Sequence, residues 1–248
     1  MPSPLITHHV VLRPVSGPAT PRDSIGGPSV LPEGVDAPSC SCGCRMILFF
    51  KFDVASTFGL PFLSGSHFSI FMCPVHNEAV EQIGPYLPER FWDHMRSYSG
   101  VPRFFRAFLH APGRAQRIQQ IESPLVHHSL TFDRAQEVLV SGDAACSVPE
   151  HPGVSSSLEQ ISADQSFKVG GQPSWLQDAV RPVCCCGAPM TFLCQVPSDY
   201  EFFKTEGAPE QPNSPASDSY VLFLGNASYF FACTNQCSPL AVYPVLQN

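Results

Sequence analysis

One pattern of glycine, proline and cysteine occurs twice in the sequence, and it limits what the chain can fold into. The first copy, IGGPSVLPEGVDAPSCSCGCRMILFF, begins at Ile25, and the second, VGGQPSWLQDAVRPVCCCGAPMTFLC, begins at Val169. A single offset aligns Gly26 with Gly170, Gly27 with Gly171, Pro38 with Pro182, Cys40 with Cys184, Cys42 with Cys186, Gly43 with Gly187, and Met46 with Met190. Internal similarity at a fixed offset indicates repeated structural units. We therefore expect two similar halves.

Each copy continues into apolar segments that end on another cysteine. MILFFKF and MTFLCQV follow the first cysteines, and HFSIFMC and SYFFAC end at Cys73 and Cys233. Aromatic and β-branched residues between turn signals predict strands. In the second copy the offset grows across TEGAPEQPNSPASDS, a composition typical of a solvated loop. A weaker echo joins LITHHVVLR to LVHHSLTFDR.

These signals predict an α+β fold that is mostly β, with two pseudo-equivalent β-rich halves and short helices between them. The first repeat spans residues 1–78 and the second spans residues 120–248. Residues 79–119 form a connecting helical segment, in which PERFWDHMRSY is typical of a short helix with a proline near its start.

The cysteines of each copy offer two close pairs separated by strands, the arrangement by which zinc is commonly bound through four nitrogen or sulfur ligands. We predict one or two structural zinc ions, held by Cys40, Cys42, Cys73 and His76 and by Cys184, Cys186, Cys233 and Cys237. Cys44 or Cys185 could replace a neighbouring ligand. All of these thiols could instead be buried small hydrophobic groups. Cys146 and Cys194 fall outside the pattern and are expected in the core.

Composition excludes several classes of function. The chain has 14 Lys and Arg against 21 Asp and Glu, a net charge of -7, and no basic cluster of the kind that binds phosphate backbones, so we expect no nucleic acid. The 11 cysteines are an odd number, and neither a secretory signal nor an apolar run of membrane-spanning length is present. We expect a cytoplasmic protein outside the membrane, and the negative net charge favours a basic protein partner.

No catalytic motif stands out. The sequence lacks the nucleophile motif Gly-x-Ser-x-Gly and a phosphate-binding loop. Trp175, which follows Gly170 and Gly171, is expected to anchor packing, with partner binding by these three residues as the alternative.

KVGGQPSWLQ followed by CCCGAPMTFLCQV resembles the YwqG-like family of bacterial proteins of unknown function, and the N-terminal region of the eukaryotic programmed cell death 2 proteins. The matching residues of the second copy are Gly170, Gly171, Pro173, Trp175, Leu176, Cys186, Gly187, Pro189, Met190, Phe192, Leu193 and Gln195. The first copy matches at Gly26, Gly27, Pro28, Cys42, Gly43 and Met46. The resemblance implies duplication, no known enzymatic activity, and a binding role that is chaperone-like or toxin-immunity-like.

Three hypotheses follow. The first is a non-enzymatic, zinc-stapled protein-interaction module. The second is a metal-dependent hydrolase, which needs a coordination position left open for water. The third is a thiol-based metal buffer or redox sensor.

Overall fold

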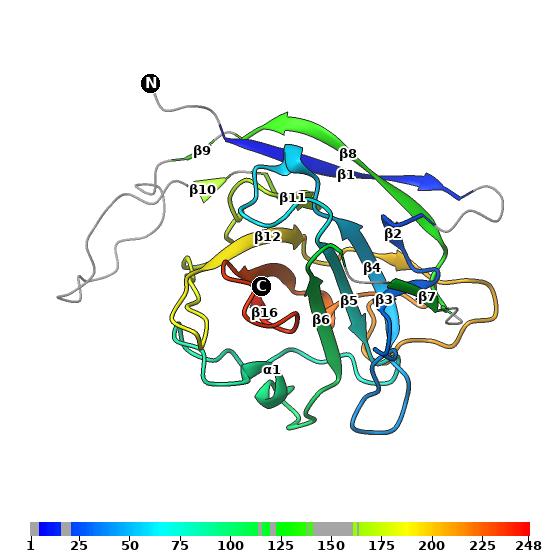
Figure 1. Cartoon of the computed structure of the whole chain (residues 1–248). Coiled ribbons are helices and arrows are strands. Elements are labelled where there is room, and N and C mark those ends of the chain that lie inside the picture. Colours follow the sequence, from blue (N-terminus) through cyan, green and yellow to red (C-terminus); the bar gives the residue numbers. More distant parts are fainter. Residues whose placement is uncertain are drawn as a thin grey trace.

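A computed structural model of the chain (Figure 1) describes residues 5–15, 21–113, 116–119, 123–137, 139–140, 161–162 and 164–248. Ten strands form one antiparallel sheet in the order β16-β15-β12-β11-β1-β8-β2-β4-β5-β6. Their bounds are β1 Ile6–Pro14, β2 Ser24–Ile25, β4 Ile47–Asp53, β5 His67–Met72, β6 Phe105–His110, β8 His128–Gln136, β11 Lys168–Val169, β12 Met190–Val196, β15 Ala227–Cys233 and β16 Val242–Gln247.

The sheet curves until its two ends nearly meet. β16 lies beside β6 (Figure 1), and the N–H of Leu109 in β6 donates to the carbonyl of Pro239, just before β16, over 2.8 Å. Near closure removes most of the free edge that an open sheet would expose. The prediction of a mostly β fold is confirmed.

Short elements complete the described chain. Three strand pairs lie outside the large sheet: β3 (Ser29–Pro32) with β7 (Gln116–Gln119), β9 (Leu139–Val140) with β10 (Ile161–Ser162), and β13 (Phe202–Phe203) with β14 (Ser219–Tyr220). Among the described residues, helix is limited to α1 (Phe91–His94) and the 3₁₀ turns Ser56–Phe58 and Phe223–Gly225. Across the described residues no helix has the length and apolar character that crossing a membrane requires.

The predicted boundaries do not separate two compact units. β1, from the predicted first repeat, lies between β8 and β11 of the second, and β8 in turn pairs with β2 of the first. The two His-His segments are β1 and β8, which pair along their whole length, from Ile6 opposite Gln136 to Pro14 opposite His128. The strands of the two halves therefore interleave in one sheet. Duplication itself stays a prediction.

The predicted helical connection, residues 79–119, is mostly not helical. It contains α1, which falls within the predicted short helix, but it also contains β6 and β7. β6 pairs with β5 from His67 opposite His110 to Met72 opposite Phe105. Two basic residues interrupt the apolar sequence FRAFLH, so the sequence did not predict this edge strand. The strand is nevertheless buried along most of its length.

The Gly-Gly pairs dock on matching irregularities of the sheet. The register of β4 against β5 shifts at Phe49, and the register of β12 against β15 shifts at Leu193. The freed carbonyl of Phe49 accepts the N–H of Gly26 over 2.9 Å, and that of Leu193 accepts the N–H of Gly170 over 2.9 Å. A bulge bends its strand and leaves a backbone group for other partners. Here the glycine turns supply those partners.

Phenylalanine rings from both predicted halves share one core. The ring of Phe50 in β4 contacts those of Phe68 in β5, Phe167 before β11, Phe202 in β13 and Phe230 in β15, with centroids 5.0–6.3 Å apart. All five side chains are buried. Because Phe50 and Phe230 belong to different predicted repeats, we expect both halves to unfold together.

Candidate metal centres

A tight turn positions Cys40 and Cys42 just before β4. The N–H of Cys40 donates to the carbonyl of Cys44 over 2.8 Å, and the N–H of Gly43 donates back to the carbonyl of Cys40 over 2.9 Å. Gly43 has φ of 89°, in the left-handed region where glycine is favoured. The turn directs both sulfurs toward the end of β5.

The same turn precedes β12. The N–H of Cys184 donates to the carbonyl of Ala188 over 2.9 Å, and the N–H of Gly187 donates to the carbonyl of Cys184 over 2.8 Å. Gly187 has φ of 83°. Each of these hydrogen bonds has its counterpart in the first turn, at the same offset that aligns the two sequence copies. The shared spacing of glycine and cysteine therefore gives the same backbone conformation in both turns.

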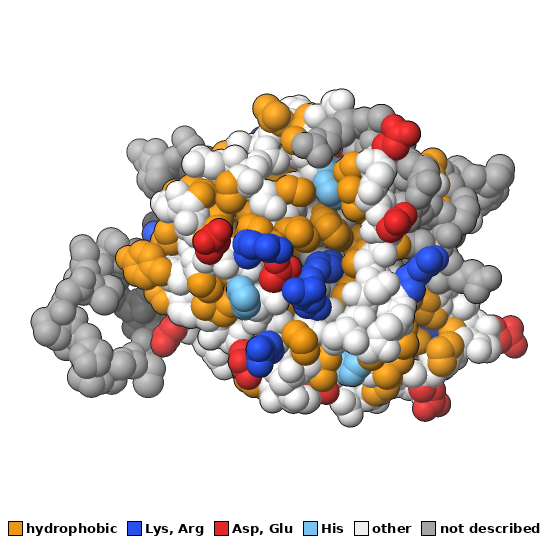
Figure 2. Space-filling model, turned by 60° about the horizontal axis from the view of Figure 1, so that its bottom comes forward, with side chains coloured by type: hydrophobic (Ala, Val, Ile, Leu, Met, Phe, Trp, Pro, Cys, Tyr) orange, Lys and Arg blue, Asp and Glu red, His pale blue; other side chains and the backbone are white. Residues whose placement is uncertain are grey.

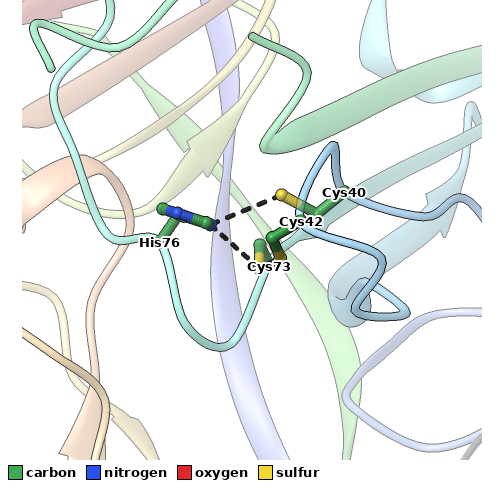
Figure 3. Close-up of side chains that lie close together, drawn as sticks. All are labelled: Cys40, Cys42, Cys73 and His76. Atoms are coloured by element: carbon green, nitrogen blue, oxygen red, sulfur yellow. Dashed lines mark hydrogen bonds between the residues drawn. The ribbon is translucent and has the colours of Figure 1, made fainter. Parts of the chain in front are cut away.

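The first cluster consists of Cys40, Cys42, Cys73 and His76 (Figure 3). His76 Nδ1 lies 3.4 Å from Cys40 Sγ and 3.5 Å from Cys73 Sγ, and Cys42 Sγ lies 3.8 Å from Cys73 Sγ. Cys73 directly follows β5, and its N–H donates to the carbonyl of Phe104 over 2.7 Å.

The second cluster consists of Cys184, Cys186, Cys233 and Cys237. Cys184 Sγ lies 3.5 Å from Cys237 Sγ, and Cys186 Sγ lies 3.5 Å from Cys233 Sγ. Cys233 is the last residue of β15, and its carbonyl accepts the N–H of Gln236 in the turn that carries Cys237. The end of a strand therefore supplies one member of each cluster, and turns supply the other three.

All eight predicted ligands meet in these two groups. Within each group the candidate ligand atoms lie within 4.8 Å of one another, and the ten described cysteines are free thiols. Cys44 and Cys185 fall outside the groups of four, although Cys185 Sγ is 3.9 Å from Cys184 Sγ. Each group could hold a metal ion. Cys194 is fully buried, as expected, and Cys146 lies outside the described residues.

The thiols of each cluster are of two kinds, those whose pKa is lowered by a backbone N–H and those whose pKa is raised by burial. The N–H of Cys44 lowers the pKa of Cys42 to about 6, and the N–H of Ala188 lowers the pKa of Cys186. Burial raises the pKa of Cys73 to about 12 and also raises the pKa of Cys184. Thiols must lose their protons to ligate metal, so the buried members of each cluster depend on a cation to ionise.

Burial also acts on Cys237, the fourth ligand of the second cluster, and raises its pKa to about 12. The Cys237 residue as a whole is nevertheless exposed. A metal ion would supply the positive charge that stabilises these sulfurs as thiolates.

Gly170, Gly171 and Trp175 serve the packing of the second half. A Cβ on Gly170 would lie 2.8 Å from the carbonyl oxygen of Phe58, and one on Gly171 would meet the carboxylate of Glu137. Trp175 is half-buried, with its ring 4.7 Å from that of Tyr229. The expected packing role of Trp175 fits these contacts, and partner binding by the three residues stays a prediction.

Sequence reasoning missed an ionic group near the end of β4, in which His67 is buried, Asp53 is half-buried and Arg22 is exposed. Asp53 accepts hydrogen bonds from Arg22 and from His67 Nδ1, the latter over 2.7 Å. Burial alone would raise the pKa of Asp53, but these partners lower it to about 2. Asp53 also borders a cavity of about 640 Å³ between β4, β1 and β8. The residues come from separate segments, so no local motif marked them.

No protein-family model matches the chain, and a search of curated proteins returns no match. The resemblance to the YwqG-like family therefore stays a prediction that rests on the residues quoted for it.

Proposed function

We propose that the chain is a non-enzymatic protein-binding module whose fold is stapled by two structural zinc ions, one in each cluster. The observation that carries the proposal is that each cluster brings four nitrogen or sulfur atoms from the chain to a single point. A structural zinc site is closed in this way, whereas a catalytic site keeps one position for water or substrate.

The separations within each cluster suit a tetrahedral zinc ion. Zinc–sulfur bonds of about 2.3 Å and zinc–nitrogen bonds of about 2.0–2.1 Å give tetrahedral edges of about 3.8 Å between two sulfurs and about 3.6 Å between sulfur and nitrogen. The sulfur pairs lie 3.5, 3.5 and 3.8 Å apart, and His76 Nδ1 lies 3.4 and 3.5 Å from its two sulfurs. A disulfide would require about 2.05 Å.

The ligand set also favours zinc over harder cations. Cys₃His and Cys₄ sites select soft or borderline metals, while magnesium and calcium take oxygen ligands. The backbone N–H groups of Cys44 and Ala188, directed at Cys42 and Cys186, are the second layer of hydrogen bonds that stabilises bound thiolates.

We further propose that the two halves arose by duplication and that the protein works in the cytoplasm. The matched turns, bulges and glycine contacts support duplication. Free thiols in the described chain suit a reducing compartment. A chaperone-like or toxin-immunity-like role rests on the family resemblance.

A thiol-based metal buffer or redox sensor is a second candidate, because each cluster has a spare thiol beside it. Cys44 interacts with Cys42, and Cys185 Sγ lies 3.9 Å from Cys184 Sγ. A spare thiol can capture an oxidised ligand or exchange with one. This function predicts that one metal ion leaves under mild peroxide while the chain stays folded.

Replacing His76 by alanine separates a structural metal site from the hydrolase hypothesis. A structural site should lose one of two zinc ions and lower the melting temperature together, with His94→Ala, an exposed histidine of α1, as the matched control. A hydrolase would instead keep its metal and lose turnover. A purified chain that binds no zinc and stays folded would contradict the proposal.

A further inference from the structure

The cavity of about 640 Å³ that Asp53 borders lies between β1, β8 and the loop that joins β4 to β5. Sites for small molecules typically have volumes of about 300–1,000 Å³. The loop crosses β1 (Figure 1), and the ring of Phe58 at its 3₁₀ turn lies 4.8 Å from the ring of His8 and 5.0 Å from that of Phe132. Phe58 and Phe132 give the cavity an apolar surface, and Thr57 adds a hydroxyl group to the lining.

Asp23 lines one end of this cavity with a carboxylate that has no ion-pair partner among the described residues. Its Oδ1 accepts the N–H of Asp53 over 2.7 Å. The cations nearby are otherwise engaged, because Arg22 pairs with Asp53 and Lys51 donates to a backbone carbonyl. Burial raises the pKa of Asp23, although the N–H of Asp53 and the charges of His67 and Lys51 act to lower it. An ammonium group in the cavity would supply the missing positive charge.

Arg134 also lines the cavity, and its exposed guanidinium has no ion-pair partner within the described chain. The carbonyl of Asp23 accepts the N–H of Leu130 over 2.9 Å, which places Asp23 beside Leu130 on β8. Arg134 follows Leu130 by four residues, about 13 Å along the strand. Phe132 lies midway and shares a face of β8 with both, because alternate residues of a strand point to the same side. Unpaired charges of opposite sign therefore lie at the two ends of an apolar strip.

The face that carries α1 offers a contrast, because its charges pair within the chain. Figure 2 shows basic and acidic side chains side by side on this face. Asp93 of α1 pairs with Arg90 and also lies 3.8 Å from Arg106. Charges that neutralise one another in this way select no ligand, whereas Asp23 and Arg134 are too far apart along β8 to do so.

His8 adds a buried polar group to the cavity wall beside Arg134. The two residues are opposite each other in the register of β1 and β8. His8 is 3% exposed, and its Nδ1 has no hydrogen-bond partner among the described residues. Burial and the charge of Arg134 lower the pKa of His8, so its ring is neutral at neutral pH. Buried nitrogens without a partner are rare in native folds, and a polar ligand would provide one.

We infer that this cavity binds a short zwitterionic peptide, specifically a dipeptide with apolar side chains. Its ammonium group would bind Asp23, its carboxylate would bind Arg134, and its side chains would pack on Phe58 and Phe132. A dipeptide spans about 7 Å when extended, and with a hydrogen bond of about 2.8 Å at each end it matches the spacing of the two charged positions. A free amino acid carries both charges on one carbon and is too short to reach both ends.

The inference goes beyond the proposed function, because no residue of the cavity belongs to a metal cluster. The test is a calorimetric titration of the zinc-loaded, full-length protein with the dipeptide leucyl-phenylalanine, for which we expect one saturable site. Acetylation of its amino end and amidation of its carboxyl end each remove one charge. Each modification should weaken binding by at least about tenfold, because a charge-assisted hydrogen bond is lost.

Two variants assign each charge of the dipeptide to a residue. Asp23→Asn should bind the free and acetylated dipeptides equally, and Arg134→Gln should bind the free and amidated dipeptides equally. Both should melt like the parent, since asparagine can still accept the N–H of Asp53 and Arg134 is exposed. Asp133→Asn and Arg13→Gln, at exposed positions of β8 and β1 outside the cavity, are the matched controls and should bind like the parent.

¹H–¹⁵N NMR locates the site, and we expect the shifts to concentrate in residues 54–65 and 130–134. Shifts that fall elsewhere, a capped dipeptide that binds as well as the free one, or tighter binding of free leucine would overturn the inference. A protein that keeps two zinc ions and its fold but binds no dipeptide would overturn this inference alone. A folded chain that binds the dipeptide but holds no zinc would contradict the proposed function alone.

Discussion

The two clusters use the same backbone turn but differ in their last ligand. In the first, Cys73 and His76 are separated by two residues, and His76 is half-buried. In the second, Cys233 and Cys237 are separated by three residues, and Cys237 is exposed. The glycine-containing turns before β4 and β12 have the same two backbone hydrogen bonds. The backbone frame of the site is thus held constant, while ligand type and access to solvent vary.

A second contrast lies beneath the glycine turns. The buried Lys51 of β4 donates through Nζ to the carbonyl of Arg22 over 3.3 Å. At the same offset, the buried Gln195 of β12 donates through Nε2 to the carbonyl of Ser166 over 3.0 Å. In the first half the donor to the carbonyl is a cation, and in the second half it is a neutral amide. Burial lowers the pKa of Lys51 to about 8, so its charge is a cost that Gln195 avoids.

Loss of a buried ligand should have the largest effect on either half. Cys73→Ser and Cys233→Ser should each remove one metal ion and about 10 kcal/mol of folding free energy, which approaches the whole stability of a domain. Because the phenylalanine core is shared, calorimetry should show one cooperative unfolding transition in the parent. Cys44→Ser and Cys185→Ser are the controls and should keep both ions. Two independent transitions would show that the halves are separate units.

Alanine at the first glycine of each pair should cost the second half more. Gly170→Ala should lower stability by about 3 kcal/mol, because a Cβ adds left-handed strain and lies 2.8 Å from a backbone oxygen. Gly26→Ala should cost about half as much, since the Cβ would lie 3.2 Å from Leu125. Urea unfolding measures both. Equal losses would contradict the difference in packing.

Trp175→Ala should destabilise by about 2 kcal/mol, because the half-buried ring packs on Tyr229 and Phe231. Urea unfolding measures the change. An unchanged unfolding midpoint would instead favour the partner-binding interpretation of this tryptophan.

Exchanging the side chains of Lys51 and Gln195, which bond these carbonyls, should change the free energy of unfolding least. The two substitutions should act in opposite directions. Lys51→Gln should stabilise the protein at neutral pH by about 1 kcal/mol, and Gln195→Lys should destabilise it. In the parent, the unfolded lysine binds its proton up to pH 10.5 and the folded one only up to about 8, so stability should rise with pH through this window. Urea midpoints of Lys51→Gln should lack that rise. A parent whose stability falls between these pH values would contradict the assignment.

The sequence predicted the clusters better than the architecture around them. Paired cysteines beside strands are a local signal, because each turn is fixed by its own glycine, so the eight residues that gather in the two clusters could be named. Strand order is not local. Nothing in the two His-His segments indicates that β1 and β8 pair with each other and cross between the halves. The repeat in the sequence predicted two similar halves but did not reveal that their strands interleave in one sheet.

Other features were hidden for different physical reasons. β6 lies in a segment that carries helix signals at one end, and residues 73–104 separate it from its partner strand β5. The ionic group of Arg22, Asp53 and His67 joins residues from three segments, and only the folded chain brings them together. Asp23 and Arg134 look like ordinary surface residues until the fold places both at one cavity.

The most direct test of the account is the amount of metal per chain, measured by elemental analysis of untagged protein purified under reducing conditions. Two zinc ions per chain, with unfolding when both are removed by a chelator, are the predicted result. A folded chain with all thiols free and no zinc would contradict the claim that the two clusters staple the fold.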